Sequence, residues 1–149
     1  MFNKVAVALC ALLVLSGCSS AKKGMHSYTS SAESDFVKNV GDRVHFAFDS
    51  SELSKESKVQ LDRQAEWLNQ NDRHSITVVV EGHCDERGTR EYNIALGERR
   101  ASTAKRYLVS KGVKEHRIET ISYGKERPAV VGNTEAAYKL NRRAVTVIK

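Results

Sequence analysis

The amino-acid sequence predicts an α/β (α+β) two-layer sandwich, in which a mixed sheet of about four strands carries its helices on one face. Segments typical of strands and helices alternate along residues 40–149. One of them, Ile76–Val80, consists only of β-branched residues, and a long segment with helical periodicity follows it. A length of 149 residues, with 40% apolar and 28% charged residues, suits one folded domain with a tail and excludes a multidomain assembly.

The predicted domain begins with a half-buried strand. Three apolar residues, Val44, Phe46 and Phe48, alternate with His45 and Ala47, which is the period of a strand with one buried face. We therefore expect these three apolar side chains to face the core.

A first helix and a central strand are expected next. Ser54 is a suitable N-cap, and Leu61, Ala65 and Leu68 would share one face of the helix that follows it. The β-branched segment Ile76–Val80 is expected to form a central strand that is buried on both faces.

A second helix is expected from about Tyr92 to Lys111, with Gly112 in a left-handed conformation at its end. Its small and apolar residues follow a 3–4–3–4 spacing and would pack on the sheet: Ile94, Gly97, Ala101, Ala104 and Leu108. Two more strands, Ile118–Tyr123 and Arg143–Ile148, complete the prediction, with a loop between them.

The N-terminal residues predict export and a lipid anchor. Lys4 precedes an apolar run of eleven residues, Val5–Leu15, which suits a signal peptide and is shorter than the roughly 18–20 residues of a membrane-spanning helix. The residues Leu15–Cys18 (LSGC) resemble the lipobox of bacterial lipoproteins. This resemblance implies cleavage after Gly17, with an S-diacylglycerol group and an N-palmitoyl group on Cys18.

A Ser-rich segment, residues 18–39, is expected to be a flexible tether between this anchor and the domain. Because Ser19, and not Asp, follows the lipidated cysteine, the resemblance implies the outer membrane as the location. Cys10 leaves with the signal peptide and Cys18 becomes a thioether, so Cys84 is the thiol that remains. The predicted organisation is a signal peptide over 1–17, a lipidated tether over 18–39 and a folded domain over 40–149.

The stretch Glu81–Ala101 contains the candidate site, because open α/β sheets bind ligands at the carboxyl ends of their strands. Asp85 lies in the loop after the central strand. Asn93 and Arg100 are seven residues apart on the next helix, so they project within about 20° of each other. A guanidinium binds a carboxylate and a carboxylate binds an ammonium, so this site suits a zwitterion. The residues alone leave a simple bridge between Asp85 and Arg100 as an alternative.

The stretch Gly82–Ala101 (GHCDERGTREYNIALGERRA) resembles the signature of the OmpA-like peptidoglycan-binding domains, and within them the branch of peptidoglycan-associated lipoproteins of the Tol–Pal system. The likeness extends from the strand at Phe46 through Ser122–Pro128 (SYGKERP) to Asn141–Val145 (NRRAV). It implies a βαβαβ(αβ) fold without cofactor or enzymatic activity. The lipobox and the tether upstream agree with the lipoprotein branch.

The resemblance implies that Asp85 binds the ammonium and Arg100 the carboxylate of meso-diaminopimelate in the peptidoglycan stem peptide. It assigns further contacts to the end of the first strand, the loop and the helix: Phe48, Asp49, Glu86, Arg87 and Asn93. Two residues depart from the family pattern. Cys84 replaces a small or hydroxyl residue, and Arg90 stands where Pro is common, which adds a thiol beside the site and a charge at its rim.

The same resemblance implies a cellular role. The domain would face the periplasm and link the outer membrane to the cell wall, supporting envelope integrity and constriction of the outer membrane at division. It also implies a second partner, the periplasmic propeller protein of the Tol system, which would compete for an overlapping surface.

Other functions fit the residues less well. A peptidoglycan-cleaving cysteine hydrolase with Cys84 as nucleophile is the alternative from another class, but His83 and Cys84 are strand neighbours and should point to opposite faces. A metal site from His45, His83 and Asp85 lacks convincing ligand spacing.

The net charge of +6 allows an anionic partner, but nucleic acid is disfavoured. The basic run Glu98–Tyr107 has no interleaved aromatic platform for nucleic acid, and export separates the chain from nucleic acid. Contact with glycan and hydrogen bonding to nearby loops are both open for three residues: Asn141, Arg142 and Arg143.

Overall fold

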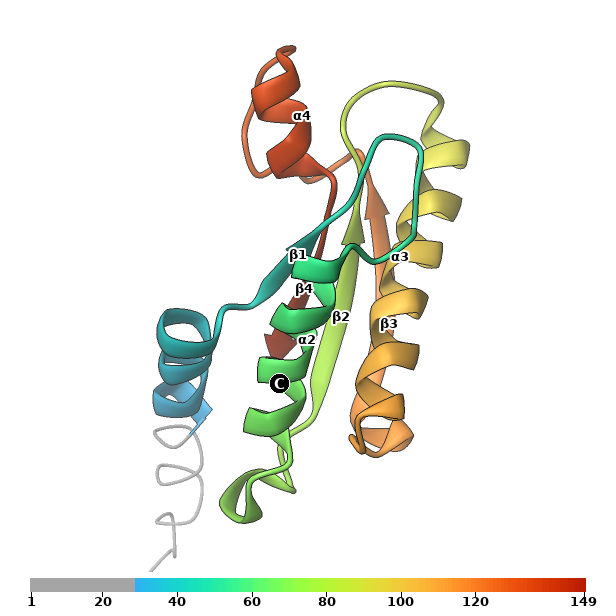
Figure 1. Ribbon diagram of the computed structural model, residues 1–149. Helices are drawn as coiled ribbons and strands as arrows, with labels where there is room; N and C mark the ends of the chain where they lie inside the picture. The colour runs from blue at the N-terminus through green and yellow to red at the C-terminus, as the bar shows by residue number, and fades with distance from the viewer. Residues whose placement is uncertain (1–28) are drawn as a thin grey trace, which may run out of the picture.

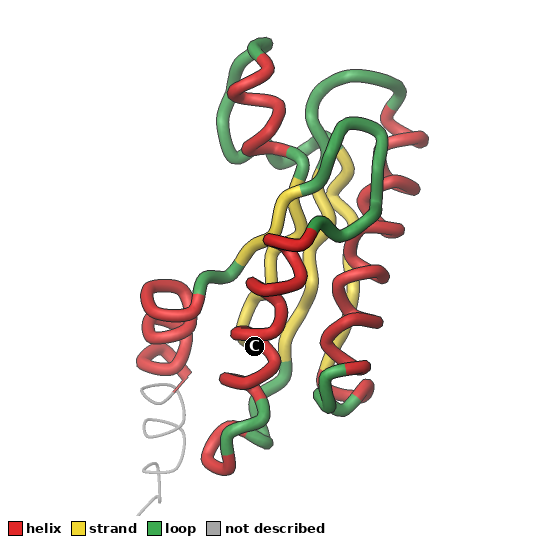
Figure 2. Tube along the Cα trace, viewed as in Figure 1, coloured by secondary structure: helices red, strands yellow, loops and turns green. Residues whose placement is uncertain are grey.

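A four-stranded mixed sheet forms the centre of the computed structural model, which describes residues 29–149 (Figure 1). The strand order is β1-β4-β2-β3, with the bounds Arg43–His45 (β1), Val78–His83 (β2), Ile118–Gly124 (β3) and Arg143–Ile148 (β4). Strands β2 and β3 are parallel, and the other two pairs are antiparallel. Two helices, α2 (Lys55–Leu68) and α3 (Arg90–Ser110), cover one face of the sheet (Figure 2), which confirms the predicted fold class.

Helix α2 follows the local signals in the sequence. The Ser54 side chain accepts a hydrogen bond from the Ser57 N–H at 3.1 Å and so caps the helix. The three predicted core positions, Leu61, Ala65 and Leu68, are all buried. The prediction for this helix is confirmed.

Helix α3 ends as predicted, and four of its five predicted packing residues are buried: Gly97, Ala101, Ala104 and Leu108. Gly112, after the helix, has a φ of 96°, which confirms the left-handed conformation. A Cβ on Gly82 would lie 1.8 Å from the Gly97 carbonyl oxygen, so the helix backbone touches the backbone of β2. The fifth predicted residue, Ile94, is 38% exposed, and a Cβ on Gly124 of β3 would lie 3.1 Å from its Cδ1. The predicted packing face of the helix is therefore confirmed, with Ile94 at its exposed edge beside the end of β3.

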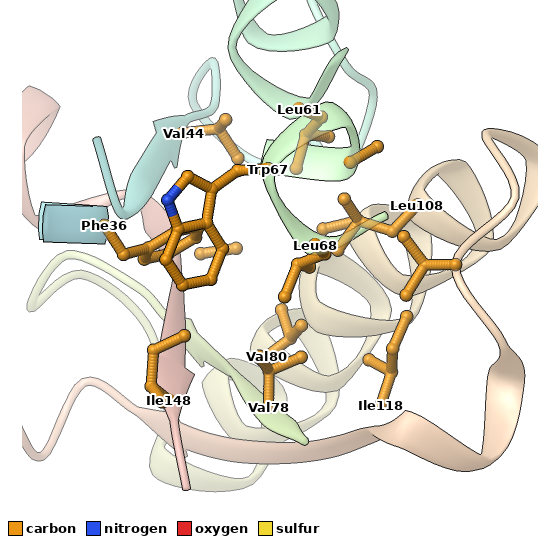
Figure 3. Packing of buried hydrophobic residues seen from close by; sticks show 14 of the residues in the cluster. Phe36, Val44, Leu61, Trp67, Leu68, Val78, Val80, Leu108, Ile118 and Ile148 are labelled. Atoms are coloured by element: carbon orange, nitrogen blue, oxygen red, sulfur yellow. The ribbon is translucent and has the colours of Figure 1, made fainter. Parts of the chain in front are cut away.

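The apolar core lies between the sheet and the two helices (Figure 3). Val78 and Val80 of β2 point into it, and Leu68 and Leu108 meet them from α2 and α3. Val79 points to the other face of the sheet and is half-buried. The expectation of burial on both faces is wrong for this strand, because helices cover the sheet on one side.

Residues 29–40 are helical, ending in a π-helical turn over Phe36–Val40. Phe36 is fully buried, and its ring centroid lies 4.9 Å from that of Trp67. Asp35 accepts a hydrogen bond from Trp67 Nε1 at 2.7 Å. The free energy gained by burying this aromatic pair exceeds the conformational entropy that the segment loses when it is ordered. The tether prediction is therefore wrong for residues 29–39. The signal peptide over 1–17 and the lipidation residue Cys18 lie outside the described residues.

The first strand and the last connection also differ from the prediction. Phe46 is buried as expected, but β1 ends at His45 and Phe48 is 60% exposed, because the chain leaves the sheet there to reach α2. A short helix, α4 (Glu135–Asn141), stands in the segment that was expected to be a loop, and its cap is Thr134. Within residues 29–149, no helix is long and apolar enough to cross a membrane.

Candidate functional site

A pocket of about 380 Å³ lies where β2 ends and α3 begins. The β1–α2 loop, the β2–α3 loop and α4 come together at this end of the sheet (Figure 1). The pocket brings together six of the seven residues predicted to contact peptidoglycan: Phe48, Asp49, Asp85, Arg87, Asn93 and Arg100. The seventh, Glu86, does not line the pocket, and its side chain instead accepts a hydrogen bond from the Tyr138 hydroxyl at 2.9 Å. Ligand contact by these residues stays a prediction.

Arg100 supplies the positive charge of the pocket. Its side chain is fully buried, and its Nε, Nη1 and Nη2 donate to the carbonyl oxygens of three residues: Ser50 at 2.8 Å, His83 at 2.8 Å and Ala47 at 3.2 Å. Burial lowers the pKa of Arg100. In the described part of the chain no carboxylate forms an ion pair with it. Since a guanidinium has five N–H groups, this arrangement leaves donors for an anionic ligand.

Asp85 supplies the negative charge, and it is 4% exposed. Its oxygens accept hydrogen bonds from Arg87 Nη2 at 2.7 Å, Arg87 Nε at 3.1 Å and Arg142 Nη1 at 3.3 Å. Burial raises the pKa of Asp85, but these hydrogen bonds outweigh burial, and the pKa lies below its usual value. The alternative of a simple bridge between Asp85 and Arg100 is wrong, because Asp85 forms its ion pairs with the other two arginines.

Arg142 belongs to the site through its contact with Asp85, although the sequence left its role open between contact with glycan and hydrogen bonding to nearby loops. It is 4% exposed, and besides Asp85 it binds the Phe46 carbonyl through Nε at 3.0 Å and Glu135 through Nη2 at 2.8 Å. Its place in the NRRAV segment of the family signature was the available signal. Its neighbours Asn141 and Arg143 hydrogen-bond nearby loops, the first to Val130 and the second to Arg127.

Asn93 shapes the loop that carries Asp85. It is 2% exposed, and its Nδ2 donates to the carbonyls of Arg87 at 2.8 Å and Thr89 at 2.9 Å. Gly88, between these two acceptors, has a φ of 92°, which a residue with a side chain rarely adopts. The Asn93 amide therefore holds the backbone of the β2–α3 loop in place, and this loop positions Asp85 in the pocket.

Two exposed aromatic side chains form the rim of the pocket. Phe48 is 60% exposed and Tyr92 is 46% exposed, and both line the pocket. The Tyr92 hydroxyl donates a hydrogen bond to Asp49, which ties the first turn of α3 to the β1–α2 loop. Phe48 and Asp49 were predicted for this site and Tyr92 was not, although the sequence has this aromatic residue in the first turn of the helix.

The geometry around Cys84 does not resemble that of a nucleophilic cysteine. The thiol is 3% exposed, it donates to the Asn93 carbonyl at 3.3 Å, and burial raises its pKa. His83 lies on the other face of the sheet, where its ring is 5.5 Å from that of Tyr123. Burial, followed by the positive charges of Arg143 and Arg127, lowers the pKa of His83 to about 4. Residues 29–149 contain no group of three or more His, Cys, Asp or Glu side chains placed to hold a metal ion.

Three comparisons relate the chain to known proteins. Residues 45–142 match the model of the OmpA family. A peptidoglycan-associated lipoprotein of Mesorhizobium japonicum is 48% identical over 156 residues, covering 98% of this chain and 92% of that protein. The corresponding protein of Rhizobium meliloti is 46% identical, covering 98% of this chain and 88% of that protein.

The solved structures agree with the sequence comparisons. The crystal structure of the peptidoglycan-associated lipoprotein from Burkholderia pseudomallei has a TM-score of 0.70 and 35% identity, and the match covers 76% of this chain and 96% of that one. The C-terminal domain of Helicobacter pylori MotB has a TM-score of 0.67 at 18% identity, with 72% of this chain and 84% of that chain covered, and so it shares the fold.

Proposed function

Because the chain belongs to the OmpA family and is similar to peptidoglycan-associated lipoproteins over nearly its whole length, we propose that it is an outer-membrane lipoprotein that binds peptidoglycan without a covalent bond. The observation that carries the proposal is a pair of opposite charges in one pocket. Arg100 is a buried cation with no carboxylate partner among residues 29–149, and Asp85 lines the same pocket.

The ligand that suits this pair is the zwitterionic end of meso-diaminopimelate in the stem peptide. Its carboxylate would accept from the remaining N–H groups of Arg100, and its ammonium would bind Asp85. Lysine-type stem peptides have the ammonium without this carboxylate, so they would leave the buried guanidinium unpaired. We therefore expect binding to diaminopimelate-type peptidoglycan and much weaker binding to the lysine type.

Two conservative variants test this assignment. Asp85→Asn keeps the shape of the side chain without its charge, and Arg100→Lys keeps a charge that cannot bind a carboxylate through two parallel hydrogen bonds. Each should weaken binding of the full chain to diaminopimelate-type sacculi by about 2–4 kcal/mol. Arg106→Lys, on the exposed side of the same helix and hydrogen-bonded within it to Thr103, is the matched control and should bind as the parent does. If both test variants, still folded by circular dichroism, bound sacculi as well as the parent, the assignment would be refuted.

The anchor is a separate part of the proposal. Cleavage after Gly17 and lipidation of Cys18 would place three acyl chains in the outer membrane, with the domain facing the periplasm. Cys18→Ser should move the protein from the detergent phase to the aqueous phase in a partition experiment. Cys10→Ser, in the segment that the signal peptidase removes, should leave partitioning unchanged. A Cys18→Ser protein that stayed in the detergent phase would contradict lipidation.

We also propose the role in the Tol system, with the periplasmic propeller protein as second partner and constriction of the outer membrane at division as the outcome. Support comes from the similarity to peptidoglycan-associated lipoproteins. If the two partners use overlapping surfaces, sacculi should reduce the capture of the propeller by the full chain. Equal capture with and without sacculi would argue against overlap.

A further inference from the structure

We propose that Arg87 is an internal competitor of the ligand: its guanidinium occupies the place on Asp85 that the ligand ammonium needs, and it must swing away before the ligand binds. This inference rests on the proposed function, because it concerns how the same pocket is opened. It assigns Arg87 a role in regulating the affinity of the site rather than in direct contact with the ligand.

The acceptor sites of Asp85 are filled. Oδ1 accepts from the Arg87 backbone N–H and from Arg87 Nε, both at 3.1 Å. Oδ2 accepts from Arg87 Nη2 at 2.7 Å and from Arg142 Nη1 at 3.3 Å. A carboxylate has about four lone-pair positions, so these four donors leave no position for an ammonium. One of them has to leave when the ligand arrives.

The two donors on the Arg87 side chain are the ones that can leave. Arg142 has 5% side-chain exposure and is held by Glu135 and by the Phe46 carbonyl. Arg87 belongs to an irregular loop and has 36% side-chain exposure. The Arg87 guanidinium can therefore move into solvent while the packed part of the domain stays unchanged.

The surroundings of Arg87 offer a second position for the displaced guanidinium. It lies between the rings of Phe48 and Tyr138, at 4.1 Å and 4.3 Å from their centroids. Glu135, in the first turn of α4, has Oε2 3.9 Å from Arg87 Nη2. A turn of the side chain along the two rings exchanges the carboxylate of Asp85 for that of Glu135. The aromatic faces hold the cation in either position.

The consequence is an affinity lower than the pocket could give. The apparent dissociation constant is the intrinsic one divided by the fraction of molecules in which Arg87 has left Asp85. Removing the guanidinium while keeping its packing should therefore tighten binding. Given the modest strength of partly exposed ion pairs and cation–π contacts, we expect a gain of roughly threefold to tenfold.

The test compares Arg87→Met with the parent full chain in detergent, using the tripeptide L-Ala-γ-D-Glu-meso-diaminopimelate as ligand and calorimetry for affinity. Met keeps an unbranched stem between the two rings but has no donor. Arg90→Met removes the same charge from an arginine that pairs with Glu126 at 3.4 Å and does not line the pocket, so it controls for net charge. Arg87→Met should bind the tripeptide more tightly than both the parent and the control.

A second ligand separates competition from a general change of the pocket. In the same tripeptide with the side-chain amine of diaminopimelate acetylated, the diaminopimelate end has no ammonium to compete with Arg87, and the L-Ala ammonium at the other end is the same in both ligands. Arg87→Met should therefore show no comparable gain with the acetylated tripeptide. Weaker binding of the unmodified tripeptide by Arg87→Met than by Arg90→Met would overturn the inference and make Arg87 a direct contact, while leaving the proposed function in place. Absence of tripeptide binding by the parent would overturn both.

Discussion

Replacing Gly82 by Ala should destabilise the domain and displace α3 from the sheet. The added Cβ would lie 1.8 Å from the Gly97 carbonyl oxygen and 2.5 Å from its carbon, and both are backbone atoms of α3. No rotation of a side chain relieves this overlap, so the helix itself must move. Overpacking of a core costs typically about 1–3 kcal/mol, and we expect the upper end of that range or more because the obstacle is backbone.

The reciprocal variant Gly97→Ala is the matched control. Its Cβ would lie 2.2 Å from Ser122 Oγ, a side-chain atom that can turn away, and 3.0 Å from the Gly82 carbonyl oxygen. Urea unfolding of both proteins, followed by circular dichroism, should give a lower midpoint for Gly82→Ala than for Gly97→Ala, with a similar slope. Since α3 carries Arg100, Gly82→Ala should also lose binding to sacculi. A Gly82→Ala protein as stable as the parent would refute the view that this contact sets the position of α3.

Two further predictions concern stability. Phe36→Ala should lower the free energy of unfolding, measured in urea, by about 3–5 kcal/mol, because the ring is fully buried against Trp67. An unchanged free energy of unfolding would instead support a flexible tether over residues 29–39. His83 has a pKa of about 4 in the folded chain, below its ordinary 6.5, so the unfolded chain binds a proton first as the pH falls. The stabilising contribution of neutral His83 to the free energy of unfolding should therefore be complete above pH 6.5 and decrease between pH 6.5 and 4. In unfolding experiments at a series of pH values, His83→Gln should make this decrease smaller. An equal decline in both proteins would exclude His83 as its cause.

The sequence determined those parts of the protein that depend on neighbours along the chain. The cap at Ser54, the left-handed Gly112 and the strand Arg143–Ile148 are each set by a few adjacent residues, and the structure has them as predicted. The βα order and the position of the pocket at the end of β2 follow from the same local signals, because the carboxyl end of a strand and the start of the next helix necessarily meet.

The helix orientation and the N-terminal helix depend on contacts between distant segments. The backbone of α3 at Gly97 lies directly against that of β2 at Gly82, and Arg100 on the same helix is fully buried. Residues 29–40 pack on the domain because Phe36 meets Trp67, 31 positions further along the chain. Neither contact has a signature in the local pattern of apolar residues.

The charge pairs of the pocket were decided by the tertiary structure alone. The strand order β1-β4-β2-β3 sets β4 beside β2 and so brings Arg142, in the segment before β4, beside Asp85, 57 residues earlier in the chain. Asp85 therefore pairs with Arg87 and Arg142 and not with Arg100. Arg100 instead donates to carbonyls of a loop about 50 residues away. Which cation reaches which carboxylate depends on distances of a few ångströms between segments, because the strength of an ion pair or hydrogen bond falls steeply with distance. Composition and periodicity along the chain carry no such distances.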